Sequence, residues 1–207
     1  LLAVLLTIGV YGAIRSLLGG IGRARETAGK IISVEHPSTD ITSVQCRLDQ
    51  AWRGHRPGQF AFVTFEGSEG AHPFTIASAD HGDRIISFQI EALGDYTGTL
   101  ATRLQAGQTV HVEGPYGRFD IARHNPRARQ IWIAGCIGIT PFFTWLDALQ
   151  DEPQKTLSAD LHYCTRDQTT DAFVPRLEAL CAALPGVHLH IHDARQGAIL
   201  SAASLGE

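Results

Sequence analysis

Short runs of alternating hydrophobic and polar residues follow one another between residues 30 and 112. The runs rich in β-branched and aromatic residues are 30–34, 43–48, 60–65, 74–77, 84–90 and 109–112. Turn-forming residues separate them, as at Pro57-Gly58 and at 81–83. One helical segment, 97–104, interrupts the series. Several short strands with regular turns predict an antiparallel β-barrel.

A different period begins after residue 120. Continuous apolar runs at 130–134, 161–164 and 187–191 are typical of buried strands, and helical segments at 139–149 and 172–184 lie between them. Pro141 falls in the first turn of a helix, where its missing N–H costs nothing. This alternation predicts a doubly wound parallel α/β sheet. The expected fold class is therefore β + α/β, with a domain boundary at 123–129.

The chain opens on an apolar run over residues 1–14. The run is shorter than the roughly 20 apolar residues that cross a bilayer. Arginine and lysine follow it, which marks the cytoplasmic side of a membrane helix, whereas a signal peptide carries its positive charge first. We interpret 1–18 as a partial transmembrane helix of a membrane protein whose remaining chain is mainly cytoplasmic, and 19–27 as a linker. A buried amphipathic helix is the alternative.

Composition excludes several classes of function. The 207 residues are 44% hydrophobic and 18% charged, which is ordinary for a globular protein, and the net charge of −4 gives no support to nucleic-acid binding. The cysteines are Cys46, Cys136, Cys164 and Cys181, and their spacing matches neither a zinc nor an iron–sulfur site. We expect free thiols and no metal site.

The segment 72–78, His-Pro-Phe-Thr-Ile-Ala-Ser, carries imidazole and hydroxyl groups on a strand. Alternation predicts His72, Phe74 and Ile76 on one face, with Pro73, Thr75 and Ala77 on the other. Thr75 could hydrogen-bond the edge of a flavin ring, and His72 could reach a ribityl or phosphate group. Taken alone, the pair also fits a half-buried histidine and a surface threonine without a ligand.

Two loops follow along the chain. In 93–100, Thr97 is expected to be a helix N-cap, and the start of that helix is a possible anion site. A simple capped helix is the alternative. The segment 114–117, Gly-Pro-Tyr-Gly, predicts a tight turn at a strand end, which would equally serve as a turn between domains.

The segment 134–142 joins a strand to a helix. Gly135 and Gly138 flank the turn, so that its backbone can approach a pyrophosphate at the helix N-terminus, and Thr140 adds a hydroxyl. The spacing differs from G-x-G-x-x-G. A plain strand–helix turn without a ligand is the alternative.

Together, these segments resemble the ferredoxin–NADP reductase superfamily, and most closely its membrane branch, the ferric-chelate reductases and NADPH oxidases. The run at 72–75, His-Pro-Phe-Thr, is similar to the flavin motif of that branch, where soluble relatives usually carry Arg-x-Tyr-Ser. The segments 57–60, 93–97, 114–117 and 134–142 are similar to family segments and follow the family order.

The resemblance implies an FAD-binding barrel over 28–122 and an NAD(P)H-binding domain over 130–207, with FAD and NAD(P)H as cofactors. Thr75 would be the catalytic contact with the flavin. The residues implied to bind the cofactors are His72, Pro73, Phe74, Thr75, Ser78, Tyr96, Thr97, Gly114, Gly117, Gly135, Gly138, Ile139, Thr140 and Arg166. Those at 72–75 would line the flavin, Tyr96 and Thr97 its pyrophosphate, and 135–140 the phosphates of NAD(P)H.

Arg166 lies in the segment 163–167, where the family contacts the adenosine ribose. It would pair either with a 2′-phosphate, favouring NADPH, or with the neighbouring Asp167. The sequence departs from the family at Cys136, where a glycine is usual. The family's Cys-Gly-Pro motif and its haem-ligating histidines lie outside the sequence given.

The implied function is transfer of electrons from NAD(P)H through FAD to a membrane haem, and then to a ferric chelate or O₂. The implied partners are the nicotinamide dinucleotide and the membrane haem domain of a parent protein, which would hold the haem, and no nucleic acid. A soluble-type FAD reductase that feeds an oxygenase or a ferredoxin is one alternative. A non-catalytic flavin-binding subunit is another.

Overall fold

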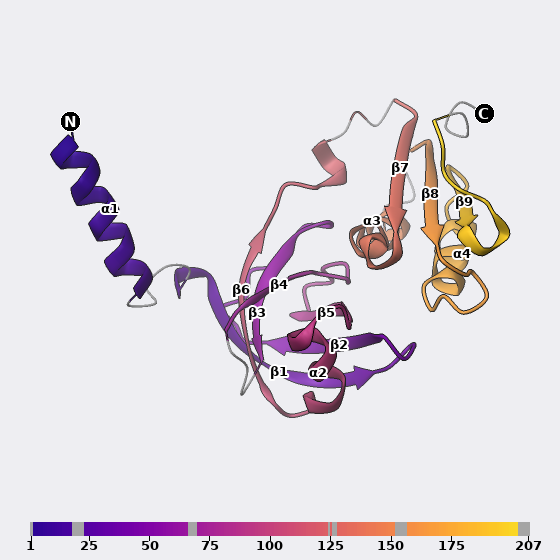
Figure 1. Cartoon of the computed structure of the whole chain (residues 1–207). Helices are drawn as coiled ribbons and strands as arrows, with labels where there is room; N and C mark the ends of the chain where they lie inside the picture. Colours follow the sequence, from indigo (N-terminus) through magenta and orange to yellow (C-terminus); the bar gives the residue numbers. More distant parts are fainter. Residues whose placement is uncertain are drawn as a thin grey trace.

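A computed structural model describes residues 2–17, 23–65, 70–123, 125, 128–151 and 157–202 of the chain. It contains a β-barrel followed by a smaller parallel sheet with helices, and a separate N-terminal helix extends from the barrel (Figure 1). The predicted fold class, an antiparallel barrel followed by a parallel α/β domain, is confirmed.

Six antiparallel strands and one helix form the barrel. They are β1 (Glu26–Glu35), β2 (Ile41–Leu48), β3 (Phe60–Phe65), β4 (His72–Thr75), β5 (Ile85–Glu91), α2 (Asp95–Arg103) and β6 (Thr109–Tyr116). The order in the sheet is β4-β3-β6-β1-β2-β5, and a single bridge between Ile76 and Phe88 joins its two ends. The barrel is therefore nearly closed, with its weakest seam between β4 and β5.

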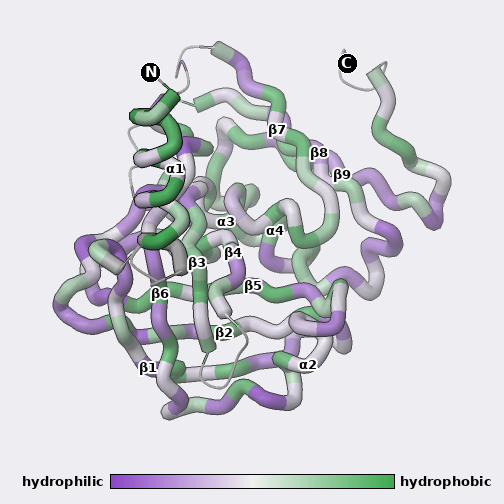
Figure 2. The backbone as a smooth tube through the Cα atoms, turned by 60° about the vertical axis from the view of Figure 1, so that its left-hand side comes forward, coloured by the Kyte–Doolittle hydropathy of each residue, from purple (hydrophilic) through white to green (hydrophobic). Residues whose placement is uncertain are grey.

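Alternation along the strands builds the barrel core. On β3, Ala61, Val63 and Phe65 are buried, whereas Phe60 and Phe62 on the opposite face are only half-buried. Because side chains of a strand alternate between its faces, every second residue lies in the barrel core and the others lie on the outer face. The colours of Figure 2 follow hydropathy along the backbone, and they mark α1 and β7 as two of the more hydrophobic stretches.

The second domain has three parallel strands, in the order β7-β8-β9. Its elements are β7 (Gln130–Gly135), the 3₁₀ turn η3 (Cys136–Ile139), α3 (Thr140–Asp151), β8 (Ala159–Thr165), α4 (Val174–Ala182) and β9 (Val187–Asp193). Both crossovers run in the same direction, and residues of α3 and α4 share one buried cluster with Trp132, Leu161 and Tyr163. On the opposite face of β7, Ile131 and Ile133 are each 50% exposed.

Direct contacts fix the barrel against the parallel domain. The Gly58 N–H donates to the Thr144 hydroxyl at 2.9 Å, and the Phe119 ring stacks on Trp145 with centroids 4.4 Å apart. Gly58 has φ +86°, and a Cβ there would lie 1.8 Å from the Phe119 carbonyl oxygen. Only glycine fits this close approach, so the Pro-Gly turn predicted at 57–58 also forms the joint between the domains.

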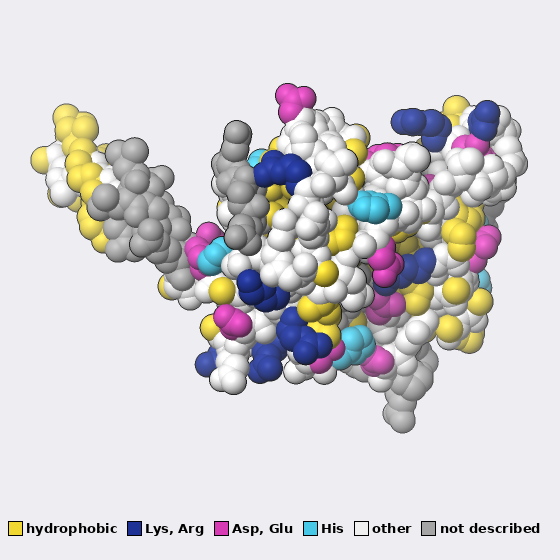
Figure 3. All heavy atoms as spheres, turned by 90° about the horizontal axis from the view of Figure 1, so that it is seen from below, with side chains coloured by type: hydrophobic (Ala, Val, Ile, Leu, Met, Phe, Trp, Pro, Cys, Tyr) yellow, Lys and Arg dark blue, Asp and Glu magenta, His cyan; other side chains and the backbone are white. Residues whose placement is uncertain are grey.

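The N-terminal helix α1 covers Leu2–Leu17. Its large hydrophobic side chains are exposed and stand away from the barrel, at the outer end of the molecule in Figure 3. No helix in the described part of the chain combines the length and apolar character that a membrane crossing needs. Strand β1 already begins at Glu26, within the segment 19–27 expected to be a linker, and residues 18–22 lie outside the described residues. The remaining 3₁₀ turns are η1 (Arg23–Arg25), η2 (Ile121–Arg123) and η4 (Ala194–Gln196).

Candidate functional site

Strand β4 separates the predicted flavin residues onto two faces, as expected from alternation. His72 pairs with Val63 and Phe74 with Ala61, two residues of the barrel interior. Pro73 and Thr75 pair with Phe62 and Phe60 on the outer face. His72 and Phe74 therefore lie on the strand face that turns toward the barrel interior, whereas Thr75 lies on the other face.

His72 contacts the helix α2 through Tyr96. The two rings are stacked, with centroids 3.6 Å apart and planes 13° from parallel. The Tyr96 hydroxyl is buried and has no hydrogen-bond partner among the described residues. A buried hydroxyl without a partner is costly, so this one is suited to a ligand that brings the partner with it. The pair predicted to approach FAD is thus assembled, and the orphaned hydroxyl fits that cofactor.

The start of α2 differs from the prediction. The helix begins at Asp95 with Gly94 as its N-cap, so the prediction of Thr97 as N-cap is wrong. Thr97 is the third helical residue, and its hydroxyl oxygen accepts from the N–H groups of Leu93 and Gly94, at 3.0 and 3.2 Å. A hydroxyl at this position reaches back to the loop, as in a capping box. The first N–H groups of α2 still lack intrahelical acceptors and suit an anion.

The turn from β7 to α3 exposes only part of the predicted nucleotide site. Gly135, Cys136 and Gly138 are exposed, and a Cβ added to Gly138 would meet nothing within 4 Å. Ile139 and Thr140 are buried, and the Thr140 hydroxyl donates to the Ile137 carbonyl at 2.6 Å. The side chains at 139 and 140 therefore do not line the open turn.

Cys136 occupies a position that favours glycine. Its φ is +47°, in the left-handed region that a side chain makes unfavourable. This agrees with the observation that the family usually has glycine there. The Cys136 side chain lines the adjoining cavity, and partial burial raises the pKa of its thiol.

A cavity of about 270 Å³ opens beside this turn, at the carboxyl ends of β7 and β8. Cys136, Thr165 and Arg166 line it from the parallel domain, and Asp40 and Glu91 line it from the barrel. Ligands of parallel α/β sheets bind outside the carboxyl ends of the strands, so this is the expected place for a dinucleotide.

Carboxylates dominate the charge of this cavity. Burial, followed by the nearby charge of Asp40, raises the pKa of Glu91, and the Arg166 guanidinium opposes that rise. Across the cavity, Asp171 accepts hydrogen bonds from the hydroxyls of Tyr163 and Thr165, at 2.7 and 2.5 Å. Arg166 therefore supplies the positive charge that a phosphate in this cavity would need.

Arg166 does not pair with its neighbour. The Asp167 carboxylate instead contacts the Arg195 guanidinium and accepts from the Thr169 N–H and hydroxyl. Within the described residues, the Arg166 guanidinium has no hydrogen bond or ion pair of its own. Of the two predicted pairings, the one with Asp167 is not formed.

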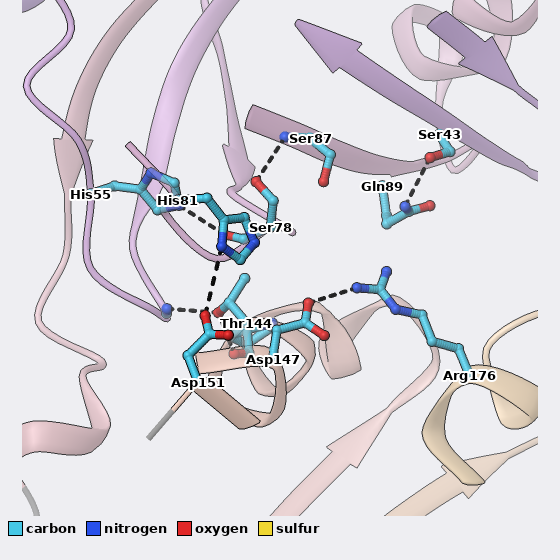
Figure 4. A network of polar contacts seen from close by, with 12 residues as sticks. Ser43, His55, Ser78, His81, Ser87, Gln89, Thr144, Asp147, Asp151 and Arg176 are labelled. Carbon is cyan, nitrogen blue, oxygen red and sulfur yellow. Dashed lines mark hydrogen bonds and ion pairs between the residues drawn. The ribbon is translucent and has the colours of Figure 1, made fainter. Parts of the chain in front are cut away.

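Three predicted site residues lie elsewhere. The Ser78 hydroxyl accepts from the Ser87 N–H at 3.1 Å, within the network of Figure 4. Gly114 and Gly117 flank Tyr116 at the end of β6, where the Gly117 carbonyl accepts from Gln59 at 3.3 Å. These residues join neither the His72–Tyr96 pair nor the cavity beside Arg166.

The network in Figure 4 includes polar groups that the sequence did not indicate. Arg176 of α4 donates to Asp147 of α3 at 2.9 Å, and His81 of the barrel lies 3.6 Å from Asp151 of α3. These residues belong to three separate segments, and no motif links them in the sequence. Among the described residues, no three His, Cys, Asp or Glu side chains are arranged to hold a metal ion.

Comparison with known families identifies the barrel. Residues 27–120 match the model of a family described as an FAD-binding domain. This match supports the prediction of an FAD-binding barrel and of FAD as its cofactor.

The relatives found by sequence are components of oxygenase systems. The reductase component of propane 2-monooxygenase from Mycolicibacterium goodii is 26% identical over 133 residues, covering 63% of this chain and 38% of the relative. The ferredoxin–NAD(P)(+) reductase component of the naphthalene 1,2-dioxygenase system from Pseudomonas putida is 25% identical, covering 81% and 50%. The chain thus spans half or less of the length of these relatives.

A solved structure has the same fold. The ferredoxin–NADP⁺ reductase from Neisseria gonorrhoeae, with bound FAD and NADP, superposes with a TM-score of 0.69 at 19% identity, covering 83% of this chain and 69% of that one. This likeness establishes the fold of the barrel and of the parallel domain.

The membrane predictions need correction. The predicted localisation as a membrane protein is wrong, since curated relatives are named as reductase components of oxygenase systems. The membrane branch of the superfamily and a membrane haem partner are not shown either, and the relatives favour the alternative in which the reductase serves an oxygenase or a ferredoxin. The likeness to the membrane branch rests on the four residues at 72–75 and on the apolar run at 1–14.

Proposed function

We propose that the chain forms the FAD- and NAD(P)H-binding part of a reductase that passes electrons from NAD(P)H through FAD to an oxygenase or a ferredoxin partner. One observation carries the proposal. The turn η3 packs against β5, and β5 runs into the loop at 92–94 that starts α2. A single strand thus connects the nucleotide cavity beside Arg166 with the wall formed by His72 and Tyr96.

The chain's own residues position the cofactors. His72 and Phe74 would face the flavin at the seam of the barrel, and the Tyr96 hydroxyl and the first N–H groups of α2 would bind its polar tail. Gly135 and Gly138 would leave room for the dinucleotide. Thr75 lies on the outer face of the barrel, at the end of β4. Two-electron uptake and one-electron release would be supplied by the bound FAD.

Cofactor binding and turnover test the proposal. The purified chain, mixed with FAD and dialysed, is expected to remain yellow, and NAD(P)H is expected to bleach its flavin absorption. Ferricyanide reduction should then depend on both cofactors, and an added ferredoxin should accept electrons. Loss of FAD on dialysis would contradict the flavin assignment. Retained FAD that NAD(P)H leaves oxidised would contradict the reductase assignment.

Arg166 offers a test of coenzyme choice. Replacing it with alanine (Arg166→Ala) is expected to raise KM for NADPH roughly tenfold, because a charge-assisted hydrogen bond contributes about 1.5–3 kcal/mol. KM for NADH should change by less than about twofold, since NADH carries no 2′-phosphate. Arg123→Ala, a change of an exposed arginine in η2, is the matched control. Equal effects on both coenzymes would show that Arg166 does not recognise the 2′-phosphate.

A further inference from the structure

The barrel carries a second cavity, which the proposed function does not use. It measures about 570 Å³, and its lining includes Arg25, Arg53, His55, Arg56 and Tyr116. We call it the arginine pocket. It lies against the segment 53–59 and the end of β6, whereas the cavity beside Arg166 adjoins β7 and β8. Its volume falls within the range of roughly 300–1,000 Å³ that is typical of small-molecule sites.

The charge of the arginine pocket is opposite to that of the chain. Three guanidinium groups line it, although the net charge of the protein is −4. The carboxylate in the lining, Asp80, accepts from the backbone N–H groups of His55 and Gly82, at 3.3 and 3.1 Å. Because the lining has three guanidinium groups and one carboxylate, it keeps an excess of positive charge for a ligand.

Neighbouring groups hold two of the arginines in place. Arg56 lies 3.3 Å from the buried carboxylate of Asp120, and the Arg25 guanidinium sits over the Tyr116 ring, 5.2 Å from its centroid. Arg53 is exposed, and no hydrogen bond or ion pair to it is found among the described residues. Two cations are therefore preorganised at the wall, and the third is available to close over an anion.

His55 adds a hydrogen-bond acceptor to this wall. Its Nε2 lies 2.8 Å from the Ser78 carbonyl oxygen, a contact drawn in Figure 4. A carbonyl only accepts, so Nε2 carries the hydrogen and Nδ1 has a lone pair. Burial lowers the pKa of His55, which favours this neutral ring. The side chain is only 8% exposed, and its Nδ1 has no hydrogen-bond partner among the described residues.

We propose that the arginine pocket binds a small hydroxylated polycarboxylate, with its carboxylates on Arg25, Arg53 and Arg56 and its hydroxyl donating to His55 Nδ1. Guanidinium groups match carboxylates in charge and in planar geometry. An oxyanion alone would leave Nδ1 without a partner, because two acceptors cannot pair. A ligand that carries both carboxylates and a hydroxyl can pair with the three guanidinium groups and with His55 Nδ1.

Titration calorimetry of the full chain tests this with two probes. Citrate carries three carboxylates and a hydroxyl, and tricarballylate is the same molecule without the hydroxyl. In a buffer free of phosphate, citrate is expected to bind at least about fivefold more tightly, because the buried Nδ1 stays unpaired with the other probe. The heat of binding is independent of reductase activity. The comparison also leaves His55 intact, because replacing it could unfold the barrel.

A substitution tests the arginines. Arg53→Gln should weaken citrate binding roughly tenfold, whereas Arg47→Gln, an equal charge change on β2 outside the pocket lining, should leave it within about twofold. Equal affinity for the two probes would overturn the role of His55. An Arg53→Gln chain that binds citrate normally would overturn the site. Failure of both probes to bind would also overturn the site. That result counts against the site even if an acidic protein partner binds this face instead.

Discussion

Single residues show how a local pattern becomes a site. Tyr96 was predicted to approach FAD from its place in a motif, and the structure stacks it on His72, which lies 24 positions earlier in the sequence. The missing partner of its hydroxyl could not be predicted, because burial of that atom depends on how α2 packs on the barrel. A motif indicates which residue type occupies a position, whereas packing determines which of its polar atoms lacks a hydrogen-bond partner.

Replacing Tyr96 with phenylalanine separates a ligand contact from a packing defect. If the hydroxyl binds FAD, Tyr96→Phe should weaken FAD binding about fivefold to tenfold, since one hydrogen bond is lost. The chain without FAD should be no less stable, because the buried unpaired hydroxyl is removed. Flavin fluorescence titration and urea unfolding measure the two effects. Unchanged FAD affinity would show that the hydroxyl does not contact the cofactor.

At the level of elements, the three parallel strands are joined by a ladder of charged groups on the face away from α3 and α4. Arg129, just before β7, donates to Asp160 of β8 at 2.6 Å, and His190 of β9 lies 3.3 Å from the same carboxylate. The hydrogen bond from Arg129 comes first among the causes that lower the pKa of Asp160 to about 2. Asp160 on the central strand β8 therefore links β8 to both edge strands, through Arg129 beside β7 and His190 of β9.

Acid titration tests the ladder. The pKa of Asp160 is lower in the folded chain than its ordinary value of 3.8, so the unfolded chain binds the proton more readily. The stability that this carboxylate contributes is present above about pH 4 and is lost as the pH falls toward 2. Asp160→Asn should unfold at lower urea concentration than the parent at pH 7, and the difference should shrink below pH 4.

The control for that titration is Asp49→Asn, which removes an exposed carboxylate at the end of β2. It should leave both the unfolding midpoint and its pH dependence close to those of the parent. If Asp160→Asn and Asp49→Asn behave alike, the ladder makes no measurable contribution to stability.

At the scale of the whole molecule, the contacts at the joint between the domains fix how the barrel and the parallel domain are arranged. The contact from the Gly58 N–H to Thr144 crosses 86 positions of sequence, and the Phe119–Trp145 stack lies beside it. This joint places the turn η3 against β5, and through it the cavity beside Arg166 against the barrel. The cavity between the domains thus depends on a few contacts between distant segments.

Replacing Thr144 with valine tests the joint. Thr144 is fully buried, and valine keeps its shape but leaves the Gly58 N–H without its acceptor. The free energy of unfolding should fall by about 1–3 kcal/mol, the cost of an unpaired buried donor. Thr102→Val on the exposed face of α2 is the matched control and should change it by less than about 0.5 kcal/mol. Urea unfolding followed by tryptophan fluorescence checks both variants.

The order and type of the elements were determined by the sequence alone, because periods of 2 and 3.6 residues are local properties that hold wherever one face is buried. The barrel and the parallel domain both followed from those periods. Motif order also indicated FAD, in agreement with the family match over 27–120, whereas the membrane branch indicated by 72–75 is not shown.

Only the tertiary structure decided which polar groups meet. It separated Thr75 from His72 and Phe74, buried Thr140 and turned Asp167 toward Arg195. It also left His55 Nδ1 without a hydrogen-bond partner among the described residues. These outcomes depend on strand register and on contacts between segments far apart in the chain. A hydrogen bond needs two atoms within about 3 Å, and no periodicity in one segment fixes a distance to another.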